Sequence, residues 1–149
     1  MNLSPHFDLP EFLRSDTALR LGIDMTPPPP VVAALTALAV NVLEPLRAHL
    51  GAPIHITSGY RPLRLNTAIG GARTSQHMVG QAADIYVTGM TPPQLCRAII
   101  AFGVPFDQCI SEFGWTHVSF NPAGKQRGQV LTAFHRPGGG VGYRPGLPE

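Results

Sequence analysis

Apolar residues recur at helical spacing in the segment that follows the four prolines of residues 27–30. They are three or four positions apart, which places them on one face of a helix: Val31, Leu35, Leu38, Val42, Leu46 and Leu50. Pro45 lies inside this pattern, and because proline lacks a backbone N–H and crowds the preceding turn, we expect a kink or a restart there. The pattern therefore predicts a helix buried in the core.

Two later segments predict β-strands. Residues 53–61, PIHITSGYR, alternate and are rich in β-branched side chains, which predicts a strand that ends near Thr57 in a Ser-Gly loop. Residues 82–87, AADIYV, predict a second strand. The residues between them, 65–81, contain three glycines and show no clean period.

A helix and a hairpin are predicted between residues 91 and 120. Thr91 is a typical N-cap, prolines occupy the first helical positions, and Gly103 follows the last turn of the predicted helix. Residues 106–120, FDQCISEFGWTHVSF, contain two alternating runs separated by a Phe-Gly pair. This pattern favours a β-hairpin.

The two ends of the chain differ from this central part. Residues 8–22 predict one or two short helical turns, so that about residues 1–30 form a helical arm with a proline-rich spacer. The Gly- and Pro-rich residues from about 135 to 149 predict a flexible tail. The order helix, strand, strand, helix, hairpin predicts one α+β domain over residues 1–149, with a small antiparallel sheet packed with helices.

Composition excludes several classes of function. The chain has 11 Lys and Arg against 9 Asp and Glu, and a formal net charge of +2 is too small to indicate a nucleic-acid surface. The longest apolar stretch, residues 31–46, includes an Asn, a Glu and a Pro and is shorter than the roughly 20 residues of a membrane span, so no membrane insertion is expected. Cys96 and Cys109 lie among apolar neighbours, which favours buried free thiols.

His77, Asp84 and His117 are a candidate set of metal ligands. Two imidazoles and a carboxylate hold zinc in hydrolytic sites and leave a fourth position open for water. On a continuous helix, His77 and Asp84 would be roughly 10 Å apart, too far for two ligands that each lie about 2 Å from one ion. Gly80 lies between them and can adopt a conformation that folds the loop back. The remaining histidines have no local acidic or histidine partner: His6, His49, His55 and His135.

Three motifs together resemble the zinc D-Ala-D-Ala carboxypeptidase family of peptidoglycan metallopeptidases, in particular its compact phage and prophage members. They are SGYR at 58–61, SQHMVGQAAD at 75–84 and WTHVSF at 115–120. The resemblance extends from residue 7 to about residue 120. It implies the α+β fold shared by D,D-peptidases, lysostaphin-type peptidases and the hedgehog signalling domain.

The resemblance also implies roles for particular residues. His77, Asp84 and His117 would bind Zn²⁺. Arg61 would contact the scissile carbonyl or a substrate carboxylate, and Ser75 would line the substrate pocket. The expected substrate is a peptidoglycan stem peptide, cut by D,D-carboxypeptidase or endopeptidase activity. Three aromatic residues are candidates for an apolar wall of the cleft: Tyr60, Trp115 and Phe120.

The catalytic base is the point at which the sequence departs from the family pattern. Relatives commonly place an acid three residues before the last histidine, but here that residue is Gly114, and the nearest acid is Glu112. If residues 113–114 form a two-residue loop, Glu112 and His117 are diagonal neighbours on one face, with Cβ atoms about 7 Å apart. A carboxylate at that distance reaches a water molecule on the metal.

This assignment depends on the length of the loop. Phe113 disfavours the positive φ of the tight hairpin turns, and a three-residue loop would change which residues share a face. Asp107 is therefore the alternative candidate for the base. It could equally be a solvated acid in a loop, without a catalytic role.

Three classes of function fit these features. The first is a zinc peptidase. The second is a non-catalytic zinc-containing module that binds the cell wall or belongs to a phage structure, as Gly114 allows. The third is a non-haem iron oxygenase, because two histidines and a carboxylate also bind Fe(II), although such enzymes usually have the many strands of a jelly roll.

The expected place of action follows from the first residues of the sequence. They contain early acidic residues and no apolar run long enough for a signal peptide. We therefore expect the protein to be made in the cytoplasm and to act on the cell wall, either after release as an endolysin or as part of a phage particle. We also expect it to be a monomer.

Overall fold

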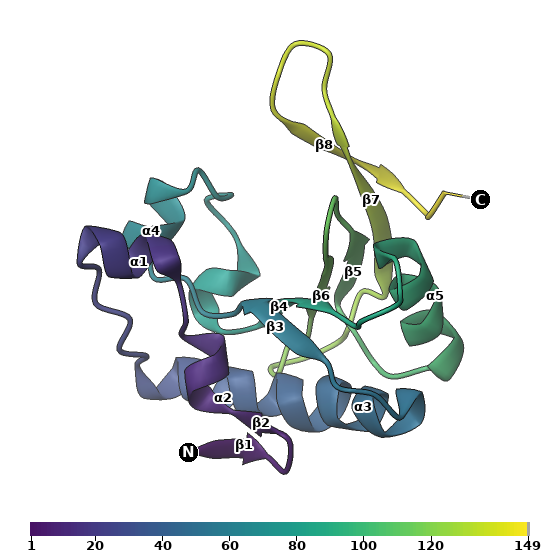
Figure 1. The fold of residues 1–149 in the computed structure, drawn as a ribbon, viewed down its shortest axis with the longest axis horizontal. Helices are drawn as coiled ribbons and strands as arrows, with labels where there is room; N and C mark the ends of the chain where they lie inside the picture. Colours follow the sequence, from purple (N-terminus) through teal and green to yellow (C-terminus); the bar gives the residue numbers. More distant parts are fainter. Residues whose placement is uncertain (149) are drawn as a thin grey trace.

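A six-stranded sheet runs through the structure, a computed structural model that describes residues 1–148 (Figure 1). In spatial order its strands are β3 (His55–Ser58), β4 (Ala82–Tyr86), β6 (Thr116–Ser119), β5 (Gln108–Ser111), β7 (Gln129–His135) and β8 (Val141–Pro145). Neighbouring strands are antiparallel except β5 and β7, which are parallel. The α+β prediction is confirmed, but the sheet is mixed, because a connection of residues 120–128 returns the chain beside β5.

The predicted core helix is confirmed. It spans 22 residues as α2 (Pro29–Leu38), the π-helical turn η2 (Ala39–Leu43) and α3 (Glu44–Leu50). Its length and composition would allow it to cross a membrane. Its apolar face, however, is buried in the same core as residues of β4 and helix α5 (Pro92–Phe102). The helix is therefore a structural element of the core.

The expected interruption at Pro45 takes the form of a π turn. The N–H of Glu44 donates to the carbonyl of Ala39, five residues earlier, instead of to the carbonyl four residues earlier. This wider turn immediately precedes the proline, whose ring crowds the carbonyl four positions before it in a regular α-helix. The helix thus continues through Pro45.

Helix α5 has the ends that the sequence predicts. The Thr91 side chain accepts a hydrogen bond from the Gln94 N–H, and the Gln94 side chain accepts one from the Thr91 N–H, which together form a capping box. Gly103 ends the helix with a φ of 88°. Cys96 and Cys109 are buried and free, as predicted.

The remaining helices are short: η1 (Leu9–Phe12), α1 (Asp16–Leu21), α4 (Leu63–Ala68) and η3 (Gln76–Val79). The first two confirm the helical turns predicted for residues 8–22. Helix α4 has only six residues, which is too short to show a period in the sequence.

The N-terminal residues are part of the core and do not form a separate arm. They begin with the small hairpin of β1 (Asn2–Ser4) and β2 (Phe7–Asp8). Phe7 and Phe12 are buried among the residues of the main core. The carbonyl of Phe12 also accepts a hydrogen bond of 2.8 Å from the N–H of Tyr60, so this segment supports the end of β3.

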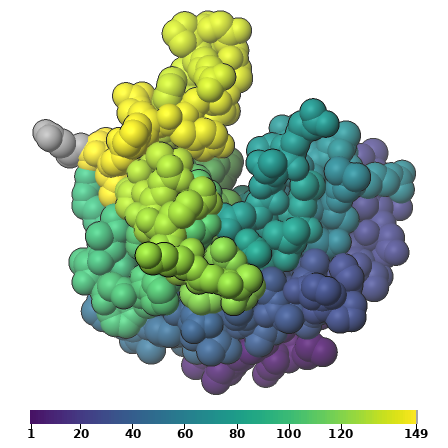
Figure 2. Space-filling view, turned by 180° about the vertical axis from the view of Figure 1, so that it is seen from behind, coloured from purple at the N-terminus to yellow at the C-terminus, as the bar shows by residue number. Residues whose placement is uncertain are grey.

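The prediction of a flexible tail over residues 135–149 is wrong for Val141–Pro145. These residues form β8, in which Tyr143 lies opposite Ala133 of β7. Gly139 and Gly140 reverse the chain with φ values of 101° and 81°, which residues other than glycine rarely adopt. The resulting hairpin rises beside a hollow whose other side is the teal segment after β3 (Figure 2).

Candidate active site

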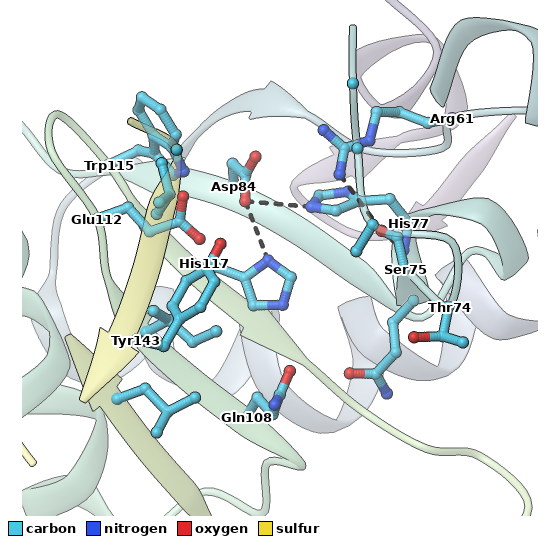
Figure 3. Close-up of a pocket in the computed structure, with 18 of the residues that line it drawn as sticks. Arg61, Thr74, Ser75, His77, Asp84, Gln108, Glu112, Trp115, His117 and Tyr143 are labelled. Atoms are coloured by element: carbon cyan, nitrogen blue, oxygen red, sulfur yellow. Dashed lines mark hydrogen bonds and ion pairs between the residues drawn. The ribbon is translucent and has the colours of Figure 1, made fainter. Parts of the chain in front are cut away.

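A cleft of about 860 Å³ contains most of the residues that the sequence singles out (Figure 3). One side is formed by Arg61 and residues 70–77, and the other by the β7–β8 hairpin. Strands β4, β5 and β6 contribute polar side chains between these two sides. Segments that are far apart in the sequence therefore meet around one open cavity.

His77, Asp84 and His117 converge at this cleft. Asp84 and His117 are directly opposite each other on β4 and β6, while His77 comes from η3. Asp84 Oδ1 lies 3.2 Å from His77 Nε2 and 3.2 Å from His117 Nδ1. All three side chains are buried, and their potential ligand atoms lie within 4.8 Å of one another. Three such donors fit a catalytic zinc site with an open fourth position.

The orientation of His77 supports this fit. Its Nδ1 donates a 2.7 Å hydrogen bond to the carbonyl of Gly59, since a carbonyl can only accept. In the neutral ring, the Nε2 atom that faces Asp84 then carries the lone pair that can bind a metal. Metal-binding histidines commonly use their second nitrogen in this way, which fixes the tautomer and the ring.

Gly80 folds the chain back between His77 and Asp84, as the sequence predicts. Its φ is 77°, in the left-handed region that favours glycine. A Cβ at this position would also lie 2.7 Å from the carbonyl oxygen of Val31. Both conformation and space thus require glycine where the core helix passes beneath the site.

Asp84 carries the negative charge that a cation site needs. Burial opposes ionisation, but the contacts with His77 and His117 outweigh it and hold the pKa of the Asp84 carboxyl well below its usual range. The carboxylate is therefore ionised throughout the neutral pH range.

Glu112 lies on the same face as His117, in the register expected for a two-residue connection. Ile110 is opposite His117, and the Glu112 N–H donates a 3.0 Å hydrogen bond to the Trp115 carbonyl. Neither Phe113 nor the following glycine has a positive φ, so the strain expected at Phe113 does not arise. Both Glu112 and His117 line the cleft.

The surroundings of Glu112 suit proton transfer. Burial and the nearby Asp84 raise the pKa of Glu112, while His117 and Arg61 partly oppose this rise. A carboxyl whose pKa moves toward neutrality is a better acid and base than one that stays fully ionised.

Arg61 and Ser75 are neighbours on the opposite side of the cleft. Arg61 Nη2 donates a 3.3 Å hydrogen bond to Ser75 Oγ, which also accepts one of 3.2 Å from the His77 N–H and so caps η3. Burial lowers the pKa of Arg61, although Asp84 and Glu112 favour its charged form. Within residues 1–148 its buried Nε has no hydrogen-bond partner. Arg61 thus has donor capacity left for a ligand.

The predicted aromatic wall is correct only for Trp115, which is half-buried and lines the cleft. Tyr60 belongs to the main core, and Phe120 packs against it. Tyr143 also lines the cleft, from β8, but the sequence gives no signal for it because its Gly- and Pro-rich segment predicts a flexible tail.

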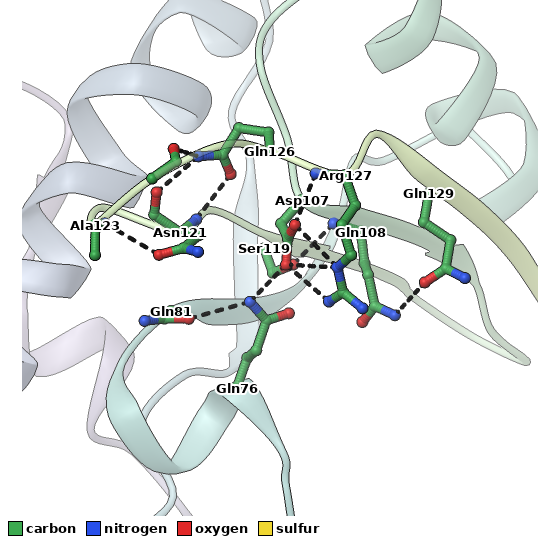
Figure 4. Close-up of polar contacts among 11 residues, drawn as sticks. Gln76, Gln81, Asp107, Gln108, Ser119, Asn121, Ala123, Gln126, Arg127 and Gln129 are labelled. Atoms are coloured by element: carbon green, nitrogen blue, oxygen red, sulfur yellow. Dashed lines mark hydrogen bonds and ion pairs between the residues drawn. The ribbon is translucent and has the colours of Figure 1, made fainter.

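Asp107 has a structural role (Figure 4). It is buried and does not line the cleft. Arg127 Nη2 lies 2.7 Å from Asp107 Oδ2, the Arg127 N–H donates to Oδ1 at 2.8 Å, and Gln76 Nε2 donates to Oδ2 at 3.0 Å. The network connects the start of β5 to η3, which carries His77. The interpretation of Asp107 as a solvated loop acid is wrong, and its engaged oxygens leave Glu112 as the better candidate base.

We expect Asp107→Asn to lower the free energy of unfolding at neutral pH by about 1–3 kcal/mol, less than for a fully buried pair because the Arg127 side chain is 55% exposed. The hydrogen bonds from Arg127, which outweigh burial, lower the pKa of Asp107. The contribution is therefore present above the unfolded-state pKa of about 4 and is lost as the pH falls through the lower folded-state pKa.

Urea unfolding of Asp107→Asn, Arg127→Gln and the double variant at pH 7 and pH 3 measures this contribution. A coupling energy of zero at pH 7 would contradict the structural role.

A mixed α+β fold with a buried His-Asp-His group beside a glutamate and an arginine is an arrangement that a metallopeptidase can use. A family model described as Peptidase M15 matches residues 5–119, and the chain belongs to this family, whose members depend on zinc. A search of curated protein sequences gives no match. The family favours a peptidase over the iron oxygenase considered from the sequence. The matched residues end with β6, so the β7–β8 hairpin lies outside them.

Proposed function

We propose that the protein is a zinc peptidase that hydrolyses a peptide bond in peptidoglycan stem peptides, as a D,D-carboxypeptidase or endopeptidase. The observation that carries this proposal is the convergence of His77, Asp84 and His117 in a cleft that also contains Glu112 and Arg61. Membership of the M15 family supports the same chemistry.

Each of these residues of the cleft has a separate role in the proposed reaction. His77, Asp84 and His117 would hold the ion, and bound zinc supplies a Lewis acid that polarises a carbonyl and makes water more acidic. Glu112 accepts a proton from the attacking water and passes it to the leaving amine. Arg61 binds the carbonyl oxygen or a substrate carboxylate.

Substrate binding involves both sides of the cleft. Ser75 holds the Arg61 guanidinium through its hydroxyl, and Trp115 provides apolar surface for the peptide. The proposed place of action is the cell wall, reached after release as an endolysin or on a phage particle. A non-catalytic module that binds zinc and the wall is the second candidate, favoured by Gly114 at the position where the resemblance expects an acid.

Digestion of purified sacculi with the zinc-loaded protein tests the proposal. We expect shortened or separated muropeptides, identified by mass spectrometry, and no products with His77→Ala. Loss of terminal D-alanine indicates a carboxypeptidase, whereas separated dimers or fragments cut after L-alanine indicate endopeptidases. Sacculi that are bound but remain intact would support the non-catalytic module.

A further inference from the structure

The β7–β8 hairpin forms one side of the cleft, opposite Arg61. Because successive residues of a strand point to opposite faces, Val141 and Tyr143 share one face of β8, and both line the cavity. Arg144 points to the other face, where its guanidinium lies 4.6 Å from the ring centre of Phe134. The alternation of β8 therefore directs Tyr143 toward the site.

Hydrogen bonds at the open end of the hairpin, where β7 begins and β8 ends, hold its two strands together. Thr132 Oγ1 donates a 2.7 Å hydrogen bond to the Gly146 carbonyl, and the Gly146 N–H donates one of 2.9 Å to the Val130 carbonyl. Next to Tyr143, a Cβ on Gly142 would lie 2.5 Å from the ring of Phe134, so a larger residue there would displace that ring. Tyr143 is thus presented by an ordered strand.

The Tyr143 hydroxyl lies among the polar groups of the site. Figure 3 shows the ring beside His117, with its hydroxyl directed toward the Glu112 carboxylate and unpaired among the residues drawn. A tyrosine phenol, whose ordinary pKa is about 10, is protonated at neutral pH. It therefore has a proton to donate to a molecule bound in the cleft.

We propose that Tyr143 is a catalytic residue whose hydroxyl donates a hydrogen bond to the carbonyl oxygen of the scissile peptide bond as that oxygen gains negative charge. This inference rests on the proposed peptidase function. Arg61 and Tyr143 then act on the substrate from opposite sides of the cleft, and the hairpin outside the family match completes the site. Two apolar residues of the hairpin, Leu131 and Val141, form the adjoining surface, which suits a small aliphatic side chain of the substrate.

Comparison of Tyr143→Phe with wild type in the full-length, zinc-loaded protein tests the assignment. The substitution keeps the ring and removes only the donor, so kcat should fall about 10- to 100-fold while KM stays nearly constant. Tyr86→Phe is the matched control, because Tyr86 is an exposed tyrosine on β4 that stacks on His55 and does not line the cleft. Its kinetics should equal those of wild type.

A binding measurement provides a readout independent of turnover. A phosphinate analogue of D-alanyl-D-alanine presents tetrahedral anionic oxygens, and calorimetry should show about tenfold weaker binding to Tyr143→Phe than to wild type. Unchanged kcat and unchanged phosphinate affinity would overturn the role of Tyr143. So would a defect that appears only in Tyr143→Leu, because it would assign the residue to packing. A wild type that binds the phosphinate through Tyr143 but cuts no stem peptide would contradict the proposed function and leave the hydrogen bond supported.

Discussion

Replacing His77 with alanine is expected to remove the bound zinc and to abolish hydrolysis. His77 would supply one of three protein ligands, and its ring is fixed by the hydrogen bond to the Gly59 carbonyl. Without this imidazole, the two remaining ligands cannot form the three-ligand site that catalytic zinc needs. Elemental analysis of protein purified without a histidine tag measures the metal directly.

Two further variants make this result specific. His117→Ala removes a ligand from the sheet instead of from η3 and should lose zinc in the same way. His55→Ala is the control, because this exposed histidine of β3 lies outside the cleft and should retain one zinc per chain. Circular dichroism checks that each variant is folded. Full zinc retention in His77→Ala would show that the ligands have been wrongly assigned.

Regular elements could be predicted from the sequence because their signals are local. The core helix shows its buried face through residues spaced from Val31 to Leu46, and α5 is delimited by Thr91 and Gly103. The same holds for the hairpin of β5 and β6, where alternation together with a two-residue loop places Ile110 opposite His117. Each inference needs only neighbouring residues and standard geometry.

Part of the site was also accessible from the sequence. The ligand types and the glycine between His77 and Asp84 indicate a metal site, and strand parity places Glu112 on the face of His117. The sequence did not show that the connection after Glu112 avoids positive φ, because this depends on the backbone of the whole hairpin.

Long-range contacts could not be predicted. Asp107 pairs with Arg127 across 20 positions, and no local pattern indicates such a partner. Tyr143 could not be predicted because the Gly and Pro residues around it are typical of a flexible tail, whereas the backbone hydrogen bonds of β8 depend on its pairing with β7. The structure therefore adds to the sequence chiefly where distant segments meet.

The exchange of Glu112 for glutamine is expected to lower turnover about 100-fold or more while zinc content stays complete. Glutamine has nearly the shape of glutamate but cannot accept the proton of the attacking water. Burial and Asp84 raise the pKa of Glu112, so in wild type kcat/KM should fall with decreasing pH at values above the usual glutamate pKa of about 4.3. The sign follows because a protonated Glu112 cannot act as the base.

The pH profile and the zinc content together distinguish a base from a ligand or a packing residue. In Glu112→Gln, the residual kcat/KM should no longer fall as the pH decreases. A defect in zinc binding would instead appear in the elemental analysis. Asp107→Asn should keep most of the activity at temperatures where it is folded, because Asp107 is engaged with Arg127 outside the cleft. If Glu112→Gln retains wild-type turnover on every substrate that wild type cleaves, Glu112 does not transfer the proton. If Asp107→Asn instead loses turnover while its fold and zinc content are intact, Asp107 is the residue that transfers the proton, in spite of its ion pair with Arg127.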